Sequence, residues 1–193
     1  MPKIKTSKQE VLNTVIPVFR RKGIANSSMS ELASECGIQK SHFYYYFESK
    51  DALVKAVLQE VNSYFGYHLE KISKDPKLSS EEIYSRIESL FEKVFLSDAK
   101  GCLMANTALE MSHTDPEYIS EVKLFFTTFI NGMTTMLQNR YRLPTAKDLA
   151  IQIVQDLEGG IILMQVFKDP QYLQNALARF KVILLGQDEA HLS

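Results

Sequence analysis

Residues 28–50 contain the side chains whose types and spacing most clearly predict chemistry. Ala33 is a very small residue, and Gly37, four positions later, tolerates the positive φ of a tight turn. Two short helices that cross closely need such a pair, with apolar side chains facing inward on both sides of the turn. The apolar residues that fall inward at helical spacing are Leu32, Cys36, Ile38, Phe43 and Phe47. This pattern predicts a helix-turn-helix, whose second helix lies in the major groove of DNA.

The outward face of that second helix, expected over 39–46, carries hydrogen-bond donors, acceptors and flat rings. Its side chains are Gln39, Lys40, Ser41, His42, Tyr44 and Tyr45. The lysine and the glutamine can reach base edges, while the hydroxyls and rings can contact bases, thymine methyls or phosphates. Ser28 and Lys50 fall at the starts of other helices, where backbone amides can hold phosphates. The alternative is an αα-hairpin with a solvated polar face, which is less favoured because three consecutive tyrosines stand beside the lysines.

The charge of the chain is unevenly distributed. The first 50 residues carry eight basic and four acidic side chains, whereas the other 143 carry 14 basic and 19 acidic ones. A basic end on an acidic body indicates that this end meets a polyanion, although many enzymes have asymmetries of this size.

Composition excludes several classes of protein. The apolar fraction of 45% is too high for a disordered chain, and 8 Gly and 6 Pro are too few for collagen or a turn-rich β sandwich. Two cysteines cannot form a disulfide framework. We identify no apolar run near the ~20 residues of a membrane helix and no apolar core of a signal peptide. We therefore expect a soluble, cytoplasmic protein with no membrane partner.

The sequence offers little for catalysis or for a metal. His42, His68, His113 and His191 lie far apart, and none has a cysteine or carboxylate at zinc-ligand spacing. Phosphate-binding glycine loops and nucleophile elbows are missing from the sequence. Cys102 and His113 are about three turns apart on one expected helix, too far to hydrogen-bond. We expect neither an enzyme nor a cofactor, and the competing class is a small-molecule-binding or enzymatic helical protein with an incidental helix-turn-helix.

Helix-start signals recur along the chain, and hairpin signals do not. Capping boxes are expected at Ser7, Ser28 and Ser79, each with a glutamate three residues later. The expected helices are 7–22, 29–35, 39–46, 50–72, 80–97, 102–112, 116–141, 146–167 and 170–186. The predicted fold is all-α, with three short helices at the N-terminus followed by a bundle of longer helices.

At this point the chain resembles the TetR family of bacterial transcriptional regulators, most closely over residues 7–60. The resemblance rests on Val18-Phe19, Gly23, Ser28-Met29, Glu31-Leu32-Ala33, Gly37-Ile38, Lys40, Phe43-Tyr44-Tyr45-Tyr46-Phe47 and Ser49-Lys50-Asp51-Ala52-Leu53. It implies DNA contacts at Lys40, Tyr44 and Tyr45, and phosphate contacts at Ser28, Tyr46 and Lys50. Pro17 and Tyr46 depart from the usual family residues, and the second departure weakens that one phosphate contact.

The resemblance also implies two domains and a function. Residues 1–49 would bind DNA, and residues 50–193 would bind an effector and form a homodimer. The expected protein is a regulator, more specifically a repressor, that a small molecule releases from a palindromic operator.

The segment Gly101-Cys102-Leu103 is similar to one in a subset of these regulators, some of which sense reactive electrophiles. A nearby helix start and Lys100 would increase the thiolate content of Cys102, which would make it reactive. The alternative is a small buried hydrophobe, which is also what we expect of Cys36. The expected effector-binding residues are Phe91, Phe95, Cys102, Asn106, Glu110, Phe125 and Phe129. Each aromatic residue among them could instead belong to the core.

Glu158 lies in an apolar helix and is followed by two glycines, each of which costs about 1 kcal/mol relative to Ala. Such a loss indicates close helix contact, which we expect across a two-fold axis in a four-helix bundle. The expected dimer-interface residues are Gln155, Glu158, Gly159, Gly160 and Ile162. Packing within one chain is the alternative.

Overall fold

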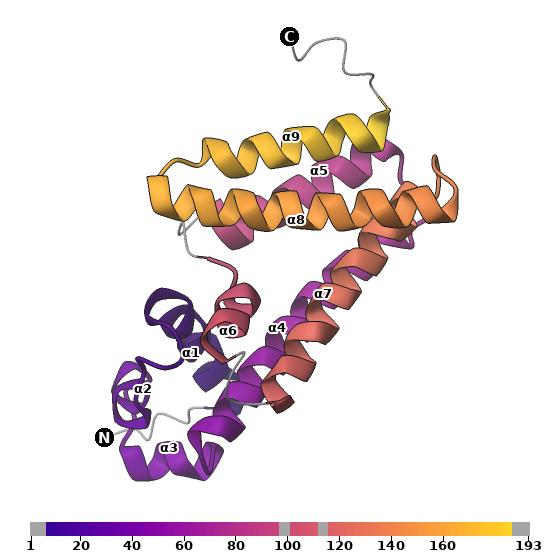
Figure 1. Cartoon of the computed structure of the whole chain (residues 1–193). Helices are drawn as coiled ribbons and strands as arrows, with labels where there is room; N and C mark the ends of the chain where they lie inside the picture. The colour runs from indigo at the N-terminus through magenta and orange to yellow at the C-terminus, as the bar shows by residue number, and fades with distance from the viewer. Residues whose placement is uncertain (1–6, 97–100, 112–115, 187–193) are drawn as a thin grey trace. The chain divides into compact units, whose positions relative to one another are not determined.

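The computed structural model describes residues 7–96, 101–111 and 116–186 (Figure 1). Every regular element in these ranges is a helix, which confirms the all-α prediction. The elements are α1 (Lys8–Lys22), α2 (Met29–Glu35), α3 (Lys40–Tyr46), α4 (Lys50–Ser73), α5 (Ser80–Phe91), the π-helical turn η1 (Glu92–Leu96), α6 (Leu103–Met111), α7 (Pro116–Leu137), α8 (Leu143–Phe167) and α9 (Gln171–Leu185).

The capping boxes expected at Ser7 and Ser79 form, whereas at Ser28 only the bond from the Glu31 amide to the serine hydroxyl forms. The Ser7 hydroxyl accepts from the Glu10 amide at 3.2 Å, and the Glu10 carboxylate accepts from the Ser7 amide at 2.6 Å. Ser79 and Glu82 form the same reciprocal pair. The bonds from Ser79 hold the pKa of the exposed Glu82 carboxyl below its ordinary value. These caps fix where α1 and α5 begin.

Three expected helix boundaries, two ends and one start, are wrong by several residues. The helix expected over 80–97 ends at Phe91 and continues as the π-helical turn η1. The helix expected to reach residue 141 ends at Leu137. In the turn that follows, the Tyr141 hydroxyl donates to the Ile183 carbonyl oxygen at 3.0 Å. Helix α8 begins at Leu143 rather than 146, since Pro144 suits a first helical turn.

Packing divides the chain into two compact units. Unit 1 runs as far as Tyr64 and also contains Leu103–Leu124, while unit 2 contains Phe65–Cys102 and the chain from Phe125 onward. Helix α6 and the first part of α4 therefore pack with the three N-terminal helices. The domain boundary expected between residues 49 and 50 stays a prediction about function.

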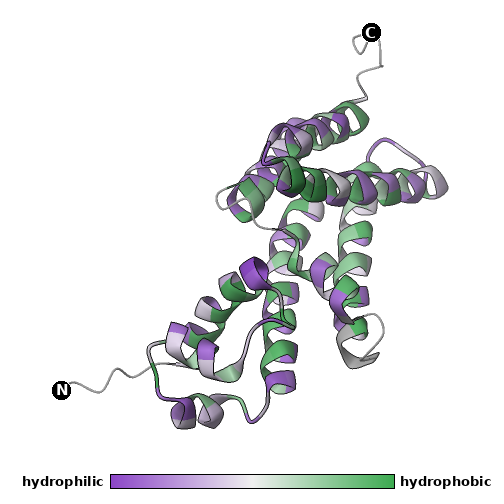
Figure 2. Ribbon diagram, turned by 60° about the vertical axis from the view of Figure 1, so that its left-hand side comes forward, coloured by the Kyte–Doolittle hydropathy of each residue, from purple (hydrophilic) through white to green (hydrophobic). Residues whose placement is uncertain are grey.

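The core of unit 1 joins its short helices to α4. Its fully buried side chains include Phe19, Leu32, Phe43, Leu53 and Leu58, which come from α1, α2, α3 and α4. Helix α1 runs through Pro17 without a break. Figure 2 shows apolar and polar residues on different sides of the helices. Each large apolar side chain buried in this way contributes about 1.5–3 kcal/mol, which offsets the amide lost at the proline.

The core of unit 2 is built on the pair α8 and α9, which lie side by side (Figure 1). Gly160 of α8 is buried, and a Cβ there would lie 3.0 Å from the Tyr172 carbonyl oxygen and 3.2 Å from the Ala176 Cβ of α9. Phe65, Phe125 and Phe129 form a separate aromatic cluster with ring centroids 4.7–6.3 Å apart. At Gly160, helix α8 therefore approaches α9 of the same chain closely.

By length and composition alone α8 could cross a membrane, with a mean hydropathy of 1.3 over its most apolar window. The expectation that no stretch is apolar enough is therefore wrong. This is weak evidence for a membrane span, because the core helix of a soluble protein passes the same test. Helix α8 also carries Asp156, which is paired with Arg179 of α9.

Candidate functional site

The turn between α2 and α3 has the geometry that the spacing of Ala33 and Gly37 predicts. Ala33 is buried, and its carbonyl oxygen accepts from the Ile38 amide at 3.1 Å. The Gly37 amide donates to the Ser34 carbonyl oxygen at 2.9 Å, and Gly37 has a φ of +65°. Because most side chains disfavour that φ, glycine lets the chain reverse within a few residues.

Two buried phenylalanines fix the rotation of α3 about its axis. Phe43 and Phe47 are buried, and their ring centroids lie 6.2 Å apart. With these rings inward, the opposite face is open to solvent. The exposed residues of this face are Gln39, Lys40, Ser41, His42, Tyr44 and Tyr45, while Tyr46 is half-buried. We call this set, Gln39 to Tyr46 without Phe43, the α3 face.

The α3 face combines neighbouring aromatic rings with a cation. The His42 ring centroid lies 5.3 Å from that of Tyr46 and 6.2 Å from that of Tyr45, which is 81% exposed. The Lys40 Nζ lies 6.0 Å from the Tyr44 ring centroid. Such a face can contact thymine methyls, donate to base edges and bind phosphates, all from one short helix.

Ser28 and Lys50, the expected phosphate contacts at helix starts, both have partners within unit 1. The Ser28 hydroxyl accepts from the Glu31 amide at 3.2 Å. The Lys50 Nζ donates to the Ala25 carbonyl oxygen at 3.3 Å. Glu31 also forms an ion pair with Lys22, and this bond holds the pKa of the exposed Glu31 carboxyl below its ordinary value.

The structure does not bring all the expected effector-binding residues into one unit. In unit 2 the ring centroid of Phe91 lies 5.3 Å from that of Phe95 and 5.9 Å from that of Phe129, and both Phe125 and Cys102 are buried in the same unit. The other two, Asn106 and Glu110, lie on α6 in unit 1. The Glu110 carboxylate accepts from the Ala25 amide at 2.9 Å.

Cys102 is buried and donates a hydrogen bond to Glu158. Burial raises the pKa of the Glu158 carboxyl to about 7, and the bond from Cys102 opposes this only in part. The Glu158 Oε2 is buried without a hydrogen-bond partner among the described residues. Lys100, which we expected to activate Cys102, lies outside the described residues.

Cys36 is half-buried rather than fully buried in the core as we expected, and its sulfur accepts a hydrogen bond from the Thr14 hydroxyl. Burial raises the pKa of its thiol. His113 and His191 lie outside the described residues. Within the part of the chain that the structure describes, no three histidine, cysteine or acidic side chains are placed to hold a metal ion.

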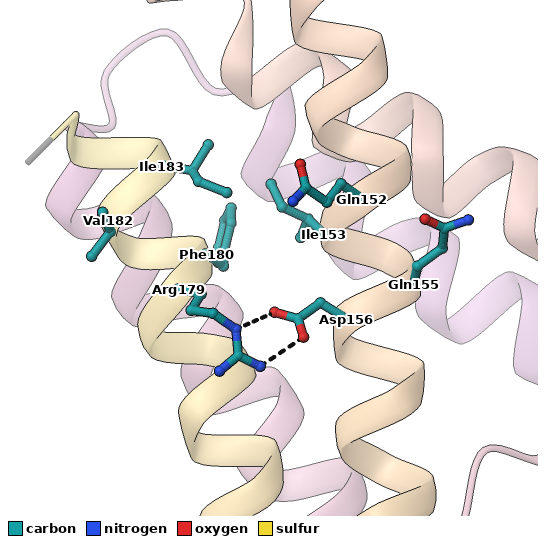
Figure 3. A pocket seen from close by; sticks show the side chains of 8 residues that line it. All are labelled: Gln152, Ile153, Gln155, Asp156, Arg179, Phe180, Val182 and Ile183. Atoms are coloured by element: carbon teal, nitrogen blue, oxygen red, sulfur yellow. Dashed lines mark hydrogen bonds and ion pairs between the residues drawn. The ribbon is translucent and has the colours of Figure 1, made fainter. Parts of the chain in front are cut away.

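The expected dimer-interface residues lie along α8. Gln155 and Ile162 are exposed, Glu158 and Gly159 are half-buried, and Gly160 is buried against α9. A groove of about 460 Å³ runs between α8 and α9 beside Gln155 (Figure 3). Across it the Arg179 guanidinium forms a bidentate ion pair with Asp156, at 2.7 and 2.6 Å.

Comparison with known families agrees with this architecture. Residues 11–57 match the family described as bacterial regulatory proteins, tetR family. Residues 80–179, more than half of the chain, match the C-terminal domain of LmrA/YxaF-like transcriptional regulators. The chain belongs to the TetR family of helix-turn-helix transcriptional regulators, which confirms the resemblance in its sequence. Such regulators bind DNA, act as dimers and are typically not enzymes.

Three distant relatives are similar to this chain over nearly their whole length. The HTH-type transcriptional repressor DhaR of Mycobacterium sp. (strain GP1) is 23% identical, and the match covers 94% of each chain. A TetR transcriptional regulator from Legionella pneumophila superposes with a TM-score of 0.83 at 23% identity, over 92% of this chain and 97% of that one. The reduced form of E. coli NemR gives 0.74 at 20% identity, over 90% and 94%. At these identities the solved structures establish the fold.

Proposed function

We propose that the protein is a homodimeric repressor that binds a palindromic DNA site through the α3 face. It leaves this site when an effector binds the part of the chain from residue 50 onward. The observation that carries this proposal is the α3 face itself, since the buried Phe43 and Phe47 turn Lys40, Tyr44 and Tyr45 outward. DhaR, a relative that matches nearly the whole chain, is a transcriptional repressor, which supports repression rather than activation. A regulator of this kind acts in the cytoplasm, where the DNA is.

Dimerisation through α8 and α9 is supported by what α8 leaves exposed. Ile162, Leu163, Val166 and Phe167 are between 41% and 65% exposed, although all four are large apolar residues. An exposed apolar stripe of this kind marks an interaction surface. Two copies joined along α8 and α9 would form a four-helix bundle and place two α3 faces on one duplex, with their centres about 34–36 Å apart.

Release would follow from a population shift. An effector that prefers a dimer whose α3 faces no longer match the groove spacing lowers the population able to bind DNA. A coupling free energy of about 1–3 kcal/mol weakens DNA binding about 5- to 150-fold. The effector must therefore distinguish the two arrangements, because equal affinity for both would shift nothing.

We propose Cys102 as the point of attack of an electrophilic effector. E. coli NemR, which has the same fold, has been solved in a reduced form, and a redox-dependent state in such a protein supports this proposal. Cys102 is only 4% exposed, so a reagent reaches it when unit 2 opens locally. Alkylation adds bulk in a closely packed site, which favours the opened arrangement. A non-covalent effector bound among the aromatic side chains of unit 2 is the alternative.

Selection of duplexes from a random pool tests the DNA-binding proposal. We expect enrichment of a palindrome whose half-sites are about 10–10.5 base pairs apart, or a multiple of that spacing. Affinity for a random duplex should fall steeply as salt rises, since phosphate contacts release counterions. A helical enzyme with a formal net charge of −1 would select no sequence and would barely bind the pool. That result would refute the proposal.

A further inference from the structure

Helix α6 holds the connection between α1 and α2 through one carboxylate. The Oε2 of Glu110 accepts from the Ala25 amide at 2.9 Å, across 85 residues of sequence. A Cβ on Gly23 would lie 2.5 Å from the Glu110 Oε1, so this oxygen also lies against the connection. Gly23 also has a φ of +82°, a conformation that other residues rarely adopt. Both oxygens of Glu110 therefore contact residues 23–25.

Ala25 is held from its other side by α4. Its carbonyl oxygen accepts from the Lys50 Nζ at 3.3 Å. The amide and the carbonyl of one residue are thus bound to side chains from two helices, α6 and α4. Within the connection, the Ser27 hydroxyl donates to the Gly23 carbonyl oxygen at 2.8 Å. These bonds give the connection a defined conformation although Ala25 and Asn26 are exposed.

The connection leads directly into the DNA-binding helices. Helix α2 begins at Met29, four residues after Ala25, and its N-cap is Ser28. Helix α2 packs against α3, so a displacement of the start of α2 is carried to the α3 face. The Lys50 ammonium would also lose its defined place if the Ala25 carbonyl moved away.

We propose that Glu110 is a positioning residue of the DNA-binding surface, which sets DNA affinity by fixing Ala25 and with it the start of α2 and the Lys50 ammonium. The inference rests on the proposed function, in which α2, α3 and Lys50 bind DNA. Glu110 touches no DNA in this scheme. Its contribution comes from holding the reading surface in place before DNA arrives.

Two substitutions at Glu110 separate positioning from charge. Glu110→Gln keeps a side-chain oxygen that accepts from the Ala25 amide, while Glu110→Ala removes it. Glu81→Ala is the matched control, because Glu81 is an exposed carboxylate on α5, in unit 2, and its loss changes the net charge equally. The probe is a duplex that the wild-type protein has selected from a random pool, at one fixed salt concentration.

The first measurement is amide hydrogen exchange at Ala25, followed residue by residue by NMR. In Glu110→Ala we expect this amide to exchange at least tenfold faster, and affinity for the selected duplex to fall about tenfold, as for one charge-assisted hydrogen bond. Glu110→Gln should stay within about threefold of the wild type in both measurements. Glu81→Ala should change neither. A general loss of stability would speed exchange at many amides and would not be rescued by glutamine.

Unchanged affinity in Glu110→Ala, or an affinity loss without faster exchange at Ala25, would overturn the inference. An equal loss of affinity in Glu110→Gln and Glu110→Ala would also overturn it, since charge rather than the hydrogen bond would then be responsible. If the wild-type protein selected no duplex, the proposed function itself would fail. Exchange at Ala25 would still report whether Glu110 holds the connection.

Discussion

The thiol of Cys102 donates a hydrogen bond to the carboxyl of Glu158 inside unit 2. Burial raises the pKa of this carboxyl from its ordinary value of 4.5 to about 7, so its charge changes near neutral pH rather than near pH 4.5. The buried Oε2 has no hydrogen-bond partner among the described residues, which makes the charged form costly. The thiol proposed to react therefore lies beside a group that gains or loses its charge near neutral pH.

Replacing Glu158 by glutamine should change how stability depends on pH. Between pH 4.5 and 7 the folded chain holds a proton on Glu158 that the unfolded chain has lost, so the free energy of unfolding falls as pH rises and levels off above about 7. Over this range the fall is about 3 kcal/mol per chain. In Glu158→Gln this contribution should vanish. Urea unfolding at pH 5 and pH 8, at one protein concentration, measures it.

The control for this prediction is Glu81→Gln, which neutralises an exposed carboxyl on α5. It should leave the difference between pH 5 and pH 8 as in the wild type. If Glu158→Gln kept the full wild-type difference as well, the carboxyl of Glu158 would not be the titrating group.

Cys102→Ser should abolish the response to an uncharged Michael acceptor such as N-ethylmaleimide. In the wild type the sulfur forms a bond to one alkene carbon and loses its proton. The other alkene carbon gains a proton. We expect an adduct on Cys102, formed more slowly than any adduct on the more exposed Cys36, and at least a fivefold loss of DNA affinity that follows the Cys102 adduct. Intact mass and a gel-shift titration at fixed salt measure the two effects. Modification should be slow, because Cys102 is 4% exposed.

Cys36→Ser is the matched control for thiol chemistry. Cys36 is half-buried and burial raises the pKa of its thiol, so this variant should keep the wild-type response. A response that survived in Cys102→Ser and disappeared in Cys36→Ser would move the sensor into the helix-turn-helix.

The neighbouring glycines of α8 should respond in opposite ways to alanine. At Gly160 a Cβ meets the backbone of Tyr172 and Leu173 at 3.0 and 3.2 Å, so α8 and α9 must separate. We expect Gly160→Ala to lower the free energy of unfolding by about 1–3 kcal/mol. At Gly159 no atom of the chain lies within 4 Å of a Cβ. Gly159→Ala should therefore raise helix stability by about 1 kcal/mol while weakening a dimer that contacts this position.

Denaturant unfolding and sedimentation equilibrium separate these two effects. The dimer contact proposed at Gly159 would be wrong if Gly159→Ala dimerised as tightly as the wild type. Stability gained at both glycines would contradict the packing of α8 against α9.

Local signals explain why most of the fold was predictable from the sequence. Hydroxyl and carboxylate pairs such as Ser7 and Glu10 act over three residues, so helix starts can be found without any tertiary structure. The helix-turn-helix is equally local, since Ala33 and Gly37 lie within one short segment. The residues that could read DNA follow once Phe43 and Phe47 are placed inward.

Contacts between distant segments were not predictable in this way. Nothing near Glu110 in the sequence indicates that its partner is Ala25, 85 positions earlier, and we expected it to bind an effector. The sequence around Gly160 indicates a close approach but not whether α9 or a second chain makes it. The π-helical turn η1 has no capping residue or proline to mark it. Tertiary packing decides these features.

Tyr44→Ala and Lys40→Ala should weaken specific DNA binding while leaving dimerisation intact. Each removes one contact of the α3 face, and we expect losses of about 1–3 kcal/mol. The lysine variant should also reduce the slope of affinity against salt by about one. Tyr67 and Lys71 of α4 form a matched control, because the same residue types lie four positions apart, with the Lys71 Nζ 4.5 Å from the Tyr67 ring centroid. Gel-shift titrations at several salt concentrations should give wild-type affinity for Tyr67→Ala and Lys71→Ala. Equal losses in both pairs would mean that the α3 face does not read DNA.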